Sequence, residues 1–234
     1  MMLTDNQYFR AAKVRGFAIL SSMGLTISRA RKIGSALPQS ITKSNEPMQS
    51  TIQNLFKSIE QDLQGINAYR YQRQISGGIQ EYMEAVLFQH YLETEKVMTY
   101  DDAPRATPGN VKLTHGDYLL GLFDMTGELM RYAVTYLATN GSLPEAGNVE
   151  QHETRKSSIL TDMQLLRSYL ETMDGSSSYG LARDFEQKLK TTRASVEKVE
   201  YGVYSMLVRG KERPKGWRPD APEGPREGDE VEAY

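Results

Sequence analysis

Residues 114–139 read THGDYLLGLFDMTGELMRYAVTYLAT, and this stretch decides the fold. Its apolar residues surround the predicted helix almost completely, which is typical of a buried helix. Asn140-Gly141 follows, a pair that readily ends a helix in the left-handed conformation. Asp124 and Glu128 lie inside the apolar segment, four residues apart and therefore on one face. Because burying a charge is costly, these acids are expected to have partners.

A second acidic pair, Glu81 and Glu84, lies in another predicted helix over residues 75–97. Glu84 is beside the apolar stripe of that helix, since Leu87, Phe88 and Tyr91 follow it by three, four and seven residues. If the two acidic faces turn towards each other, they place four carboxylates around one point. Such a cluster needs a cation or a proton, and a set of carboxylate ligands favours Mg²⁺ or Mn²⁺.

The rest of the chain has helical periodicity and no strand pattern of useful length, so the predicted fold class is all-α. We expect one helical domain over residues 47–210, since 234 residues suit a single domain with a small appendage. Pro47 suits the first turn of its first helix and Gly65 the end. Further helices are predicted over 150–173 and 178–207, with a loop over 99–112. Residues 76–78, Ser-Gly-Gly, mark a weak start or a bend.

The two ends of the chain differ in composition from this domain. Residues 1–46 form a basic segment, with seven basic residues and one acidic residue up to position 45. This block suits a contact with nucleic acid or a membrane surface, a targeting segment, or an ordinary first helix. Residues 211–234 hold four prolines, three glycines and seven acidic residues, and are predicted to be disordered. Trp217 in this tail is expected to be exposed or to dock on the body or a partner.

Several classes of protein are excluded. The chain has no cysteine, which rules out disulfides, thiolate zinc sites and a cysteine nucleophile. None of its three histidines stands three residues after a glutamate, so the Glu-x-x-His pattern of four-helix di-iron proteins is absent. No apolar run reaches the roughly 18–20 residues of a membrane span. The formal charge of −2 indicates no particular partner.

Basic and aromatic residues alternate just before Glu81, in the run Tyr69, Arg70, Tyr71, Gln72 and Arg73. Arginine contacts phosphates and tyrosine stacks on bases, a combination that suits single-stranded nucleic acid. The same pattern also suits a contact between helices in which the arginine stems lie along apolar surface.

The sequence resembles the translin superfamily, and within it the branch of translin-associated factor X (Trax). The resemblance covers roughly residues 47–213 and rests on six segments. They are IQEYMEA at 79–85, FQHYLET at 88–94, GDYLLG at 116–121, DMTGELMR at 124–131, and the short matches KVE at 198–200 and VRG at 208–210. Residues 1–40 do not align with the family's long first helix.

This resemblance implies an all-α, translin-like bundle of about seven helices. It implies a hetero-oligomer with translin, an octameric barrel that encloses single-stranded RNA, with DNA as an alternative, in the cytoplasm and nucleus. It also implies an Mg²⁺-dependent endoribonuclease (with Mn²⁺ as the alternative ion) that trims small-RNA passenger strands or transfer-RNA precursor fragments. Glu81, Glu84, Asp124 and Glu128 occupy the catalytic positions, with Glu84 and Glu128 the foremost metal ligands. Tyr69, Arg70, Tyr71 and Arg73 fall where RNA is bound.

Two rival interpretations remain at this stage. One is a non-catalytic partner that binds nucleic acid and stabilises translin. The other is a plain helical interaction module whose acidic residues are solvated, in which case a metal would change neither stability nor activity.

Overall fold

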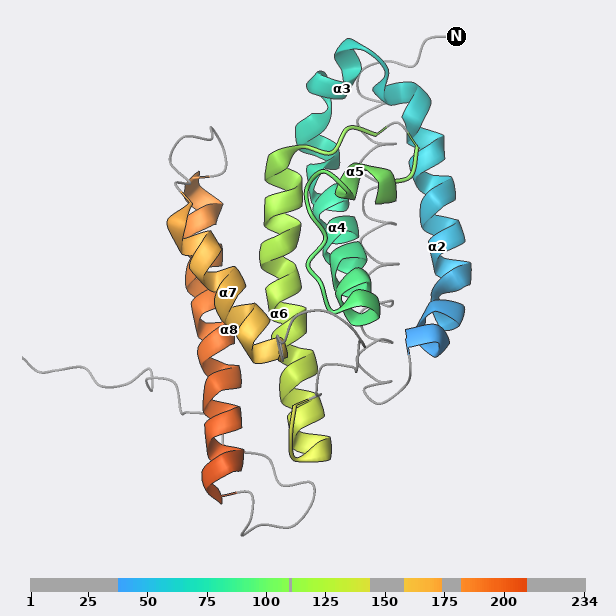
Figure 1. Cartoon of the computed structure of the whole chain (residues 1–234). Helices are drawn as coiled ribbons and strands as arrows, with labels where there is room; N and C mark the ends of the chain where they lie inside the picture. The colour runs from blue at the N-terminus through green and yellow to red at the C-terminus, as the bar shows by residue number, and fades with distance from the viewer. Residues whose placement is uncertain (1–37, 110, 144–157, 174–181, 210–234) are drawn as a thin grey trace, which may run out of the picture.

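The structure is a computed structural model that describes residues 38–109, 111–143, 158–173 and 182–209 (Figure 1). Within these ranges it has seven α-helices, one short 3-10 helix and no strand, which confirms the all-α fold class. The predictions for residues 1–37 and 211–234 lie outside the described residues. The helices are α2 (Pro38–Glu60), η1 (Gln61–Leu63), α3 (Ile66–Arg70), α4 (Gln72–Thr94), α5 (Ala103–Ala106), α6 (His115–Asn140), α7 (Ile159–Thr172) and α8 (Ala182–Arg209).

Helix α6 lies at the centre of the described part of the chain, between α4 and α8 (Figure 1). The Thr114 hydroxyl caps its start by accepting a hydrogen bond of 3.1 Å from the backbone N–H of Asp117. Gly141, with φ of 78°, ends the helix in the left-handed conformation that glycine adopts without strain. Because α6 packs against helices on two sides, its sequence is apolar almost all round.

Helices α4 and α6 are in close contact at Gly121. A Cβ atom added to Gly121 would lie 2.7 Å from Cβ of Met83 and 3.0 Å from the carbonyl oxygen of Gln80. No side chain fits into this space, so the glycine lets the two helix backbones come together. Met83 lies between Glu81 and Glu84 in the sequence, and the crossing therefore positions the acidic residues of α4.

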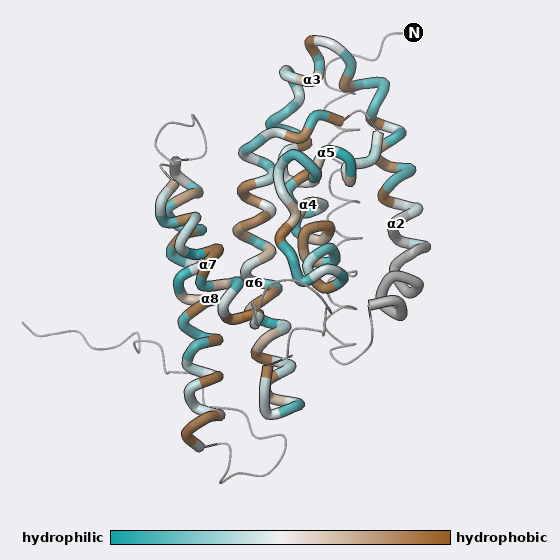
Figure 2. The backbone as a smooth tube through the Cα atoms, in the orientation of Figure 1, coloured by the Kyte–Doolittle hydropathy of each residue, from teal (hydrophilic) through white to brown (hydrophobic). Residues whose placement is uncertain are grey.

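Helices α7 and α8 complete the described core. The ring centroids of Phe123 and Phe185 lie 5.3 Å apart, and this edge-to-face pair joins α6 to α8. The Tyr91 hydroxyl donates a hydrogen bond of 2.7 Å to Asp162, joining α4 to α7. Apolar residues recur along α4 and α6 and appear again at the C-terminal end of α8 (Figure 2). Among the described helices, none combines the length and the apolar character that crossing a membrane requires.

A buried carboxylate, Asp117, fixes the register of α4 on α6. Asp117 is 3% exposed, and its oxygens accept hydrogen bonds from Gln72 at 2.7 Å, Thr114 at 2.7 Å and Gln80 at 3.2 Å. The hydroxyl of Ser76 donates to it as well. Three of these donors lie on one face of α4, so the network holds the first turns of that helix against the start of α6.

Asp117→Ala is expected to lower the free energy of unfolding by about 2–4 kcal/mol, because it leaves several partly buried donors without their acceptor. Urea unfolding measures this change. Asp102→Ala is the matched control, since the Asp102 side chain is 54% exposed. It is expected to change the free energy of unfolding by less than about 1 kcal/mol. Equal losses for the two variants would contradict the role given to Asp117.

The helix boundaries differ from the prediction in two places. Helix α2 begins at Pro38, and Pro47 lies inside it instead of in its first turn. The prediction was wrong because a helix can continue through proline when it gives up one backbone hydrogen bond. The Ser-Gly-Gly run at 76–78 lies within α4, whereas the chain bends at Tyr71, which has φ of −106° and ψ of 5°. The predicted loop over 99–112 contains the short helix α5.

Candidate active site

Glu81 and Glu84 lie on consecutive turns of α4, at its contact with α6. Glu84 is 8% exposed and Glu81 is half-buried. The backbone nitrogen of Glu84 would lie only 3.2 Å from a Cβ atom on Gly121, so this residue lies at a close contact of the two helices. The packing therefore removes Glu84 from bulk water while Glu81 stays accessible to it.

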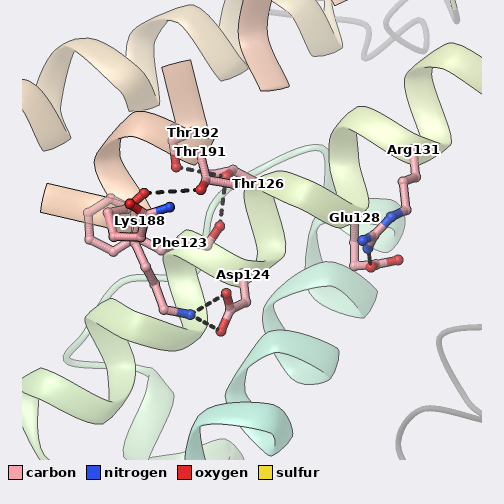
Figure 3. A network of polar contacts seen from close by, with 9 residues as sticks. Phe123, Asp124, Thr126, Glu128, Arg131, Lys188, Thr191 and Thr192 are labelled. Atoms are coloured by element: carbon pink, nitrogen blue, oxygen red, sulfur yellow. Dashed lines mark hydrogen bonds and ion pairs between the residues drawn. The ribbon is translucent and has the colours of Figure 1, made fainter. Parts of the chain in front are cut away.

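Asp124 and Glu128 both lie on α6 (Figure 3). They follow Gly121 by about one and two helical turns. Glu128 is 2% exposed, and its carboxylate accepts a hydrogen bond from the Arg131 guanidinium of the next turn. Asp124 is half-buried, and both of its oxygens accept hydrogen bonds from the Lys188 ammonium of α8, at 2.5 and 2.6 Å. Each acidic residue of this pair thus has a cationic partner.

The acidic residues of the two helices interact electrostatically. Burial, followed by the charges of Glu81 and Asp124, raises the pKa of Glu84 to about 7, while Arg131 and Lys188 oppose this rise. Burial and then the charge of Asp124 raise the pKa of Glu81, and Lys188 again opposes the rise. The structure therefore brings Glu81, Glu84 and Asp124 into one electrostatic neighbourhood. Arg131 connects Glu128 to these residues, because it pairs with Glu128 and its charge also lowers the pKa of Glu84.

The chemistry of this donor set fits a hard divalent cation. All four side chains offer carboxylate oxygens, the ligands that Mg²⁺ and Mn²⁺ prefer. Burial is the main cause of the raised pKa of Glu84, and the charges of Glu81 and Asp124 add to it; a bound dication would relieve this added repulsion. As the side chains stand, however, no three histidine, aspartate or glutamate residues in the described ranges form a ready set of metal ligands. Lys188 and Arg131 supply the positive charge at the site in this arrangement.

Glu84→Gln is expected to stabilise the metal-free chain at pH 8 by about 1–3 kcal/mol. The folded-state pKa of about 7 lies above the ordinary value of 4.5, so folding disfavours the ionised form. The Glu84 contribution to stability is therefore full below about pH 4.5 and is lost as the pH rises through about 7. Urea unfolding in EDTA at pH 5 and pH 8 measures the effect. A gain of equal size at both pH values would contradict the raised pKa.

The predicted RNA-binding residues lie near the start of α4. Arg70 and Arg73 are exposed, and Tyr69 is 72% exposed. The Lys112 ammonium donates to the Tyr69 hydroxyl at 3.1 Å and lies 4.4 Å from its ring centroid, a cation–π contact. Tyr71 packs partly against the core, so its ring is less accessible than that of Tyr69. Arg73 precedes Glu81 by eight residues on α4, about 12 Å along the axis.

Sequence reasoning missed three residues of this region. Lys188 belongs to another helix, 64 residues after Asp124, and no local spacing reveals it. Arg131 follows Glu128 by three residues, so the spacing of ion pairs on a helix surface could have identified it. Lys112 lies at the end of the predicted loop, where no pattern connects it with Tyr69.

The chain matches the Translin family over residues 18–210, so the match begins earlier than the expected resemblance over 47–213 and includes residues 18–40. It is 30% identical over 218 residues to Translin-associated protein X of Rattus norvegicus, a match that covers 81% of this chain and 69% of that protein. It is also 30% identical over 201 residues to the Pongo abelii protein of the same name, covering 75% of this chain and 63% of the relative's length. The Schizosaccharomyces pombe homolog is 29% identical over 176 residues, covering 75% and 69%.

The solved structure titled "Crystal structure of apo-NeC3PO" has a similar fold, with a TM-score of 0.54 and 16% identity. The match covers 88% of this chain and 99% of that one. At this identity the likeness concerns the fold alone. The relatives named Translin-associated protein X and the extent of the family match confirm the predicted family. The chain therefore belongs to the translin family.

Proposed function

We propose that this chain is the catalytic subunit of a complex with translin, and that it cleaves single-stranded RNA by Mg²⁺-dependent hydrolysis of phosphodiester bonds. The observation that carries the proposal is the convergence of acidic residues from α4 and α6, with Glu84 buried among them. Buried, mutually repelling carboxylates are candidates for catalysis, since such groups are costly to keep for stability alone.

Each acidic residue has a proposed role. Glu84 and Glu128, the two most buried, are the foremost ligands of the cation, and Asp124 and Glu81 complete the set. A bound Mg²⁺ or Mn²⁺ supplies Lewis-acid stabilisation of the negative charge that develops on the phosphate. Glu81 is the more accessible acid of the α4 pair, and its carboxylate accepts the proton of the attacking water as general base.

The substrate is proposed to approach along the start of α4. Arg70 and Arg73 bind its phosphates, and the exposed ring of Tyr69 offers a stacking surface. Tyr71, being partly packed on the core, orients this segment and is less accessible to a base than Tyr69. Contacts to phosphates and stacking on bases form with DNA as well as with RNA, so this surface does not exclude DNA. The proposed activity is hydrolysis of RNA, in small-RNA passenger strands or transfer-RNA precursor fragments.

Assembly with translin is supported by the name of the relatives, Translin-associated protein X, and by a surface of this chain. Four apolar side chains near the C-terminal end of α8 are exposed and follow one another at helical spacing. They are Tyr201 (46%), Tyr204 (64%), Leu207 (73%) and Val208 (54%). Contiguous exposed apolar side chains often mark protein interfaces. We propose an octameric hetero-oligomer, in the cytoplasm and nucleus.

A second candidate function is a non-catalytic scaffold that binds nucleic acid and stabilises translin. One observation favours it. Lys188 and Arg131 already pair with Asp124 and Glu128, so these acidic residues of α6 could serve structure alone. Metal dependence separates the two candidates.

The test is cleavage of an end-labelled single-stranded RNA by the full-length chain co-purified with translin, in Mg²⁺ and in EDTA. The catalytic proposal predicts cleavage in Mg²⁺ and none in EDTA, whereas translin purified alone should cleave far more slowly. A properly assembled complex that binds the RNA but does not cleave it would favour the scaffold.

A further inference from the structure

Lys188 enters the acidic site from α8, a helix that carries none of the four acidic residues. Its ammonium lies 2.5 and 2.6 Å from the two oxygens of Asp124, a contact that occupies both of them (Figure 3). The Lys188 side chain is only 28% exposed. Solvent therefore screens this contact less than it would on an open surface.

The same ammonium acts on more than its direct partner. The positive charge of Lys188 also lowers the pKa values of Glu81 and Glu84 on α4, against the larger rise that burial causes. The ammonium thus contacts Asp124 directly, and its charge also acts on two carboxyls of α4. This is the placement expected of a counter-ion to the whole cluster, whereas a bridge that only ties α8 to α6 would need to reach Asp124 alone.

A lysine ammonium and a divalent cation would compete for the Asp124 carboxylate oxygens. Both are attracted to the Asp124 oxygens, and two cations of this kind repel each other at short range. A divalent ion can therefore bind Asp124 only by displacing the Lys188 ammonium. Arg131 stands in a different position, because its side chain is 49% exposed and pairs with Glu128 from within the same helix.

We propose that Lys188 is the resident counter-ion of the acidic site, which competes with a divalent metal for Asp124 and so weakens and tunes metal binding. This inference rests on the proposed function only in that the four acidic residues bind such a metal. In this role Lys188 offsets part of the negative charge of the metal-free cluster, which favours folding. It leaves Asp124 when the metal binds.

The test is the affinity of the full-length, EDTA-stripped chain for Mn²⁺, measured by titration calorimetry at fixed pH and ionic strength. Lys188→Met removes the charge and keeps the apolar stem, and is expected to lower the Kd for Mn²⁺ about tenfold. Lys188→Arg keeps the charge and should stay near the wild type. Lys190→Met, an exposed lysine two residues away on α8, is the matched control and should leave the Kd unchanged.

The outcomes distinguish the role proposed for Lys188 from the proposed metal-dependent function. A Kd in Lys188→Met equal to or weaker than that of the wild type overturns the inference, while Mn²⁺ binding and RNA cleavage by the wild type leave the proposed function intact. Binding by Lys188→Met with none by the wild type supports it. Absence of binding in both overturns the metal site and the inference together. Should Lys188→Met not fold, Lys188→Gln keeps a hydrogen bond to Asp124 without the charge, and the same tighter Kd is required of it.

Discussion

Glu81→Gln is expected to slow RNA cleavage by the assembled complex by about 100-fold or more, the size of a lost general base. The substitution keeps the shape of the side chain and removes its ability to accept a proton at neutral pH. Since Glu81 is half-buried, and burial and the charge of Asp124 already raise its pKa, the neutral amide is expected to leave the fold and the assembly intact. Single-turnover cleavage of labelled RNA measures the loss.

Glu93→Gln is the matched control for this variant. Glu93 lies on the same helix, about three turns beyond Glu81. It is exposed and accepts a hydrogen bond from Gln89 at 2.8 Å. The control variant should cleave at the wild-type rate. If Glu81→Gln cleaves as fast as Glu93→Gln, Glu81 does not take the proton.

The second large effect is expected at Gly121. Even Gly121→Ala should lower the free energy of unfolding by about 1–3 kcal/mol, because the added methyl group overfills the helix crossing. Its Cβ atom would meet Cβ of Met83 at 2.7 Å and the α4 backbone at 3.0 and 3.2 Å. Backbone atoms cannot turn aside, so α4 and α6 must separate. The separation would move Glu84 away from Asp124, and cleavage should fall with stability.

Gly127→Ala on the same helix provides the control. A Cβ atom there has nothing within 4 Å. Alanine should therefore gain about 0.5–1 kcal/mol from its better helix propensity. Thermal or urea unfolding should show changes of opposite sign in the free energy of unfolding of the two variants. A stabilised Gly121→Ala would show that the helices are not in close contact at this residue.

The parts of this structure that depend on local sequence could be predicted. Helix α6 extends over His115–Asn140, against a prediction of 114–139, because one uninterrupted apolar segment ends at Gly141. The acidic pairs lie on helix faces as their spacing requires. The start of α2 was missed because Pro47 looks like a first-turn residue, although it lies inside that helix.

The parts that depend on contacts between distant segments could not be predicted. Asp117 reads as one acidic residue among many, yet donors from α4, up to 45 residues away, surround it. Gly121 has no local signal that distinguishes it from Gly127, and only the crossing with α4 separates them. Lys188 reaches Asp124 because α8 packs on α6, a pairing that helical periodicity does not specify.

The central claim is that the acidic residues of α4 and α6 act on RNA as one site. A double-mutant cycle of Glu84→Gln and Asp124→Asn, measured by single-turnover cleavage in saturating Mg²⁺ by the complex with translin, tests it most directly. Residues that act as a unit are strongly non-additive, so the double variant should lose about as much rate as either single variant. A loss in the double variant equal to the product of the two single losses would show that the two helices contribute independently, and would contradict the claim.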